Sequence, residues 1–147
     1  MSVRARSLAL ILVATPLAAC ASGGNQVFDD SAYGAMTPEM AVTGFLDAAR
    51  TDEYRQMANL FGTADGPAER SMGRAEVEQR MFVLASILEH SGYELRRLNL
   101  TEEPGRARVF ADMQGTRSGN VTVPFLTARN EGRWFVEQIE TRPLTER

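Results

Sequence analysis

The sequence predicts an α+β fold in which three N-terminal helices pack on a four-stranded antiparallel sheet. Apolar residues recur at the three- and four-residue spacing of a helix up to His90, and they alternate with polar residues after Gly92. The connections between the expected strands are short and rich in turn residues, which favours antiparallel neighbours. Helices first and strands second is the order typical of helices packed on one face of a sheet.

Thr37 begins the first expected helix, because its capping hydroxyl is followed by a proline and then by an acidic residue at the positive end of the helix dipole. The second helix is expected to start near residues 51–53 and to end at Gly62. Residues 63–73 are rich in Gly, Pro and Ala and are expected to form a loop. A third, longer helix is expected over roughly residues 74–90, with an apolar stripe at Val77, Met81, Leu84 and Leu88, widened by Phe82 and Ile87.

The strands are expected at residues 93–100, 106–113, 120–129 and 133–141. Pro124 suggests that its strand lies at an edge or carries a bulge, because proline cannot donate to a ladder. Asn130-Glu131-Gly132 is a tight hairpin signal between the last two strands.

The N-terminus has the layout of a secretory signal peptide. Arg4 and Arg6 are followed by a short apolar run and then by Leu17-Ala18-Ala19-Cys20. The apolar run is too short to span a bilayer, which takes about 20 residues. An ordinary cysteine after an ordinary signal peptide is the alternative, but this is the only cysteine of the chain, and an unpaired cysteine in an exported protein needs an explanation.

The residues that end at Cys20 resemble the lipobox of bacterial lipoproteins. The resemblance implies that residues 1–19 are removed, that Cys20 carries the lipid, and that the protein is tethered to a membrane of the bacterial cell envelope on the periplasmic side. Ala21 in place of an aspartate favours the outer membrane. Residues 20–36 are expected to be the lipidated cysteine and a flexible linker, and residues 37–147 a single domain.

Composition excludes several kinds of chemistry. All 16 basic residues are arginine, so no lysine is present for a Schiff base or a phosphate-binding loop. A single histidine excludes a metal site built on two histidines, and a single cysteine excludes an internal disulfide. The net charge of −3 argues against a nucleic-acid partner. We expect no cofactor and no metal.

The order of helices and strands resembles the nuclear transport factor 2-like superfamily, the cystatin-like cone. Residues 41–61 look like its opening pair of helices, and residues 132–139 look like its last strand, in which Trp134 and Val136 face the core. The resemblance implies a curved sheet around a conical pocket. It does not imply one function, since members include enzymes, small-molecule binders and assembly domains.

Asp112, Glu137 and His90 are the candidates for a site in such a cone, with Tyr93 close to His90 in sequence. Two carboxylates on a partly apolar face could be driven apart in pKa, as acid–base catalysis requires. The alternative is that both carboxylates point to water and that His90 caps a helix end or lies on the surface.

We therefore expect a non-enzymatic binding or assembly domain, whose partner is an envelope protein or a small molecule in addition to the membrane reached through the lipid on Cys20. The alternative is a small pocket enzyme (isomerase, dehydratase or hydrolase-like) that uses Asp112 or Glu137. Under the binding hypothesis both carboxylates should be exposed, whereas Phe61, Leu84 and Trp134 should carry the packing. An arginine cluster in the sheet could bind an anionic partner or form a solvated strand face: Arg96, Arg97, Arg106, Arg108, Arg117, Arg129 and Arg133.

Overall fold

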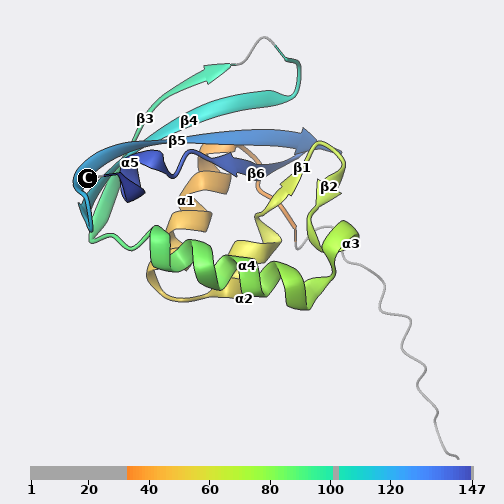
Figure 1. Cartoon of the computed structure of the whole chain (residues 1–147). Coiled ribbons are helices and arrows are strands. Elements are labelled where there is room, and N and C mark those ends of the chain that lie inside the picture. The colour runs from red at the N-terminus through yellow and green to blue at the C-terminus, as the bar shows by residue number, and fades with distance from the viewer. Residues whose placement is uncertain (1–32, 101–102, 147) are drawn as a thin grey trace, which may run out of the picture.

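A computed structural model describes residues 33–100 and 103–146, with the side chains of 97–100 left out (Figure 1). The predicted signal peptide, Cys20 and most of the predicted linker lie outside the described residues. The elements in chain order are α1 (Pro38–Arg50), α2 (Tyr54–Asn59), β1 (Gly62–Thr63), β2 (Gly66–Pro67), α3 (Glu69–Met72), α4 (Arg74–Ile87), β3 (Gly92–Leu100), β4 (Arg106–Thr116), β5 (Gly119–Asn130), β6 (Arg133–Ile139) and α5 (Arg142–Thr145).

The mixed α+β class and the four-stranded antiparallel sheet are confirmed. The strands lie in the order β3-β4-β5-β6, so each pairs with its neighbour in the chain. Glu131 and Gly132 join β5 to β6, and both have positive φ angles, 46° and 83°. Two positive φ angles in a two-residue loop match the twist of a hairpin, which is why the Asn-Glu-Gly signal is informative.

Pro124 is tolerated in an inner strand of the sheet because β6 ends beside it. β5 lies inside the sheet, but the backbone N–H of Glu140, one residue past the end of β6, donates to the carbonyl of Pro124 at 3.0 Å. The nitrogen and the carbonyl of one strand residue point to the same side. The missing N–H of Pro124 therefore faces the last position of the β5–β6 ladder and leaves the ladder's interior intact.

The helices cover one face of the sheet, and α1 lies directly on it. α1 contacts all four strands, and α4 packs mainly on α2 and α1, farther from the sheet (Figure 1). Thr37 caps α1, since its Oγ1 accepts from the N–H of Met40 at 3.1 Å. The core between the layers contains fully buried side chains from both, among them Phe45, Leu46, Met81, Val109, Met113 and Phe125. Phe61, Leu84 and Trp134, expected to carry the packing, are only partly buried at the edge of this core.

Residues 33–36 belong to the packed structure although the sequence placed them in the linker. Ala35 pairs with Trp134 of β6, and the guanidinium of Arg133 donates to the carbonyls of Tyr33 and Gly34 at 3.0 and 3.1 Å. Gly34 has a φ of +66°, and a Cβ there would lie 2.9 Å from the ring of Phe135. The strap formed by residues 33–36 therefore covers the free edge of β6.

The prediction of a continuous loop over residues 63–73 is wrong. It contains β2 and α3, and β1 with β2 forms a small hairpin. A Cβ on Gly62 would lie 2.5 Å from the carbonyl oxygen of Gly66, so the close pairing of these two strands requires glycine. The short C-terminal helix α5 was also not predicted, because four residues are too few to show a helical spacing of apolar residues. Its Leu144 is buried.

Replacement of Phe125 by alanine should destabilise the domain by about 3–5 kcal/mol, because a fully buried aromatic side chain leaves a cavity in the interlayer core. Urea unfolding monitored by circular dichroism measures this change. Met40→Ala is the matched control, since that side chain is 55% exposed, and it should change stability by no more than about 0.5 kcal/mol. Equal effects of the two substitutions would contradict the described core.

Candidate functional site

The predicted carboxylates lie on the face of the sheet that points away from the helices, here called the outer face. Residues opposite one another across β4 and β5 share a face. The outer-face pairs are Arg106 with Ala128, Arg108 with Leu126, Phe110 with Pro124, and Asp112 with Thr122.

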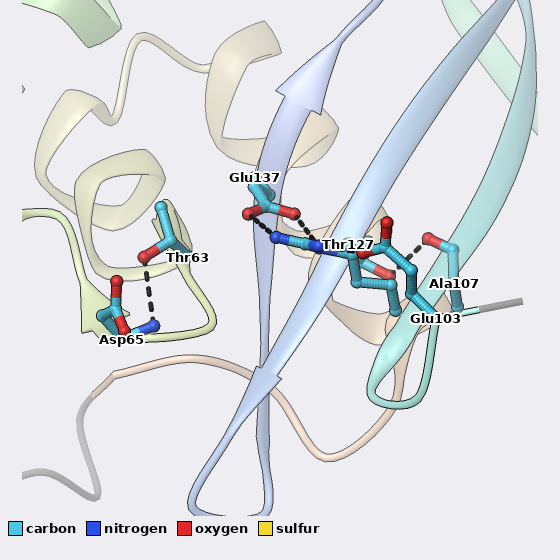
Figure 2. A network of polar contacts seen from close by, with 7 residues as sticks. Thr63, Asp65, Glu103, Ala107, Thr127 and Glu137 are labelled. Atoms are coloured by element: carbon cyan, nitrogen blue, oxygen red, sulfur yellow. Dashed lines mark hydrogen bonds and ion pairs between the residues drawn. The ribbon is translucent and has the colours of Figure 1, made fainter. Parts of the chain in front are cut away.

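Glu137 is held on the outer face by Arg106. The Nε and Nη2 atoms of Arg106 donate to the two carboxylate oxygens of Glu137 at 2.8 and 2.9 Å (Figure 2). Arg106 is on β4 and Glu137 is on β6, so the side chain of Arg106 crosses β5. Ala128, the β5 residue opposite Arg106 in the register, is fully buried. Arg106 also pairs with Glu103, and hydrogen bonds to Glu137 and Glu103 raise its pKa. This bidentate bridge ties three strands together.

The expectation that Glu137 points freely to water is wrong. Its side chain is 15% exposed. The β5–β6 register shifts between Leu126 and Thr127, which pair with Gln138 and Val136 and leave Glu137 as an extra residue. A bulge of this kind breaks strict alternation, so Glu137 no longer has to share a face with Phe135 and Ile139.

Asp112 is also paired rather than free. It binds Arg96 of β3, and its Oδ1 accepts from the hydroxyl of Thr122 on β5 at 2.5 Å. These contacts, the Thr122 hydrogen bond first and Arg96 second, lower the pKa of Asp112. Its side chain is 25% exposed, less than predicted. Both candidate carboxylates are therefore bound by an arginine side chain.

The two carboxylates do not form a catalytic pair. Asp112 and Arg106 are six residues apart on β4, which places them about 20 Å apart along the strand. Between them lies a shallow hollow of about 190 Å³, lined by Arg108, Phe110, Pro124, Leu126, Gln138 and Glu140. Neither Asp112 nor Glu137 lines that hollow.

His90 lies away from both carboxylates, on the helix side of the sheet. Its Nδ1 is 2.6 Å from the carbonyl oxygen of Leu88, the C-cap residue of α4, so the predicted capping contact exists. The side chain is buried, not at the surface, and its Nε2 has no hydrogen-bond partner among the described residues. The ring meets the ring of Tyr93 edge-on at 5.6 Å.

Tyr93 connects this region to α1. Its hydroxyl donates to Asp47 Oδ1 at 3.0 Å and lies 3.3 Å from the carbonyl of Thr43. Burial is the main reason that the pKa of Tyr93 is raised, and the hydrogen bond to Asp47 adds to it. These contacts join β3 to α1. Tyr93 and Asp112 lie on opposite faces of the sheet, because Tyr93 is opposite Met113 in the register.

A larger hollow lies beside α4 and was missed by the sequence analysis. It measures about 490 Å³ and is called here the α4 groove; its lining residues are Phe61, Glu76, Gln79, Arg80, Val83 and Leu84. Val83 is 52% exposed. Arg80 and Glu76 form an ion pair at 2.8 Å on its rim. The groove therefore combines an apolar floor with a rim whose two charges neutralise one another.

The rotation of α4 explains why the groove was missed. Its buried side is formed by Val77, Met81, Ala85 and the C-cap residue Leu88. Leu84, which the sequence placed on the core stripe, therefore lies one position off it. Phe82 is 58% exposed and packs edge-on against Tyr54 of α2, with 5.4 Å between ring centroids. Apolar residues on both sides of one helix were the available signal for a further contact surface.

Comparison with known proteins identifies no relative: the chain matches no family model and no curated protein sequence. No helix in residues 33–100 or 103–146 is long and apolar enough to cross a membrane. Within the same described residues, no group of three or more histidine, cysteine, aspartate or glutamate side chains is arranged to hold a metal ion.

The lowered pKa of Asp112 predicts a specific dependence of stability on pH. Its folded-state pKa lies below the ordinary value of about 3.9. The stability from this carboxylate is therefore fully present above about pH 4 and is lost as the pH falls through the folded-state pKa. Asp112→Asn lacks this contribution at every pH. The difference in free energy of unfolding between the wild type and Asp112→Asn, measured with urea, should be largest near neutral pH and should shrink below about pH 4. A difference that stays constant down to about pH 3 would contradict the described contacts.

Proposed function

We propose that the chain is a lipoprotein of the bacterial cell envelope, anchored through Cys20 on the periplasmic side and most favourably in the outer membrane. The signal-peptide layout of residues 1–19 and the lipobox resemblance support this proposal. Residues 20–32 would then connect the lipid to the part of the chain that the structure describes. More than one acyl chain on the cysteine would give stable anchoring.

We further propose that the domain is a binding module, and the α4 groove is the observation that carries this proposal. Residues 81–85 of α4 are all apolar, and a helical stretch that is apolar all round is normally buried, yet Phe82 and Val83 are more than half exposed. An apolar floor with a polar rim is the anatomy of a protein contact site. Because Glu76 and Arg80 neutralise one another, the rim does not select a charged ligand. The occupant best suited is an apolar peptide segment of another envelope protein.

The positions of the carboxylates support binding over the alternative of a pocket enzyme. Glu137 and Asp112 are each paired with an arginine on the outer face. Arg106, the partner of Glu137, lies about 20 Å along β4 from Asp112. The inner face, which a cone-shaped pocket would need, is occupied by fully buried side chains such as Val109, Met113 and Phe125. A relationship to the nuclear transport factor 2-like cone, with α1, α2 and α4 as its three helices on a curved sheet, is part of this proposal.

Lipidation of Cys20 is tested by metabolic labelling with a clickable palmitate analogue in a bacterial host. The wild-type chain should be labelled and should fractionate with membranes, whereas Cys20→Ser should be unlabelled and should accumulate with its signal peptide uncleaved. Wild-type protein that is abundant, unlabelled and released with the periplasmic fraction would contradict the proposed anchor.

The α4 groove is tested with the dye 8-anilinonaphthalene-1-sulfonate, which fluoresces on apolar surfaces. Val83→Gln should markedly lower the dye's fluorescence enhancement, because it places an amide on the floor of the groove. Met40→Gln is the matched control, since Met40 is similarly exposed but lies on α1. Both variants should keep wild-type stability to within about 0.5 kcal/mol. An unchanged signal from Val83→Gln, or an equal loss from Met40→Gln, would contradict a binding role for the groove.

A further inference from the structure

The two edges of the sheet differ in whether other backbone covers them. The edge formed by β6 is covered: Ala35 pairs with Trp134, and the N–H of Val136 donates to the carbonyl of Leu60 at 2.8 Å. The edge formed by β3 has β4 on one side and no strand on the other among the described residues, as Figure 1 shows. Backbone donors and acceptors along an open edge are a template for another strand.

Residues 92–96 are the regular part of this open edge. They pair with β4 without interruption, and the register shifts only between Arg96 and Asn99. This stretch contains no proline, and no bulge interrupts it, although these are common ways of protecting an edge. Its charged residues are Glu94 and Arg96, which both lie on the outer face with Leu95 between them on the inner face.

Glu94 lies in an unfavourable position within a single chain. It is directly opposite Asp112 in the β3–β4 register, and like charges opposite one another destabilise a sheet. Arg96 binds Asp112, and no ion pair to Glu94 is found among the described residues. The open side of β3 is therefore where a positive charge opposite Glu94 would be stabilising.

We propose that a second copy of this chain supplies that charge by pairing antiparallel along β3, with the two-fold axis at Leu95. In this register Glu94 of each copy faces Arg96 of the other, and the two Leu95 side chains meet on the inner face. Leu95 is already packed against the edge of the core, so the contact extends the apolar layer from one copy to the next. The two four-stranded sheets become one continuous sheet.

Neighbouring registers are disfavoured by charge. An axis at Glu94 places the two Glu94 side chains opposite one another, and an axis at Arg96 does the same for the two arginines. Residues directly opposite in an antiparallel pair share a face, so these like charges would be close. The Leu95-centred register is the one of the three that places both charges opposite their complements. The sequence Glu94-Leu95-Arg96 is thus complementary to itself in antiparallel pairing.

Charge-swapped variants of the whole chain test the pairing. Two differently tagged copies are co-expressed, extracted in mild detergent and co-purified, and sedimentation gives the mass of the complex. Wild-type copies should co-purify as a dimer. Glu94→Arg with itself, or Arg96→Glu with itself, should weaken association at least about tenfold, since each places like charges opposite one another twice. Glu94→Arg mixed with Arg96→Glu should restore the dimer, because both cross-strand pairs are then opposite in charge.

Asp112→Asn is the control for Arg96→Glu, because it removes the same bond within the chain without changing the charges of β3. It should leave the dimer intact, and all variants should retain the wild-type circular dichroism spectrum. A monomeric wild-type chain, undiminished association of either single variant, or a mixture that associates no better than the single variants would each overturn the proposal.

Discussion

The apolar contact between α1 and the inner face of the sheet is the constraint on which the rest of the structure depends. Phe45 and Leu46 from the helix meet Val109 and Phe125 from the central strands, and all four are fully buried. Because side chains alternate along a strand, burying one set sends the other set to the outer face. The positions of Arg106, Asp112 and the outer hollow follow from that single choice of face. The groove beside α4 follows from the same layering, since α4 packs mainly on the other helices.

Features with a local cause were predictable from the sequence. The cap at Thr37 and the two-residue turn at Glu131 and Gly132 depend on a few neighbouring residues, and the antiparallel order follows from short connections. The β1–β2 hairpin and the strap of residues 33–36 were not predicted, because both depend on distant partners. Gly34, for example, is required by the ring of Phe135, about a hundred residues further along the chain.

The candidate site shows the same division between local and distant causes. The sequence left open whether Asp112 lies in a pocket or points to water, because its partners Arg96 and Thr122 come from the two adjacent strands. The burial of Glu137 was not predicted because its partner Arg106 lies on β4, and a contact across β5 depends on strand order and pairing register. The α4 groove was missed because helical spacing allowed either Leu84 or Ala85 to lie on the core stripe, and only packing against α1 and α2 decides between them. His90 kept its predicted capping contact, yet the surrounding chain buries it.

The most direct test of the central claim, that this domain binds a partner instead of catalysing a reaction, is rescue of a deletion strain under envelope stress. Val83→Gln, Asp112→Asn and Glu137→Gln are compared at equal abundance of folded protein. The binding account predicts that both carboxylate variants rescue growth, since their charges serve structural ion pairs, whereas Val83→Gln does not. Full rescue by Val83→Gln together with failure of Asp112→Asn or Glu137→Gln would contradict the account and place acid–base chemistry on the outer face.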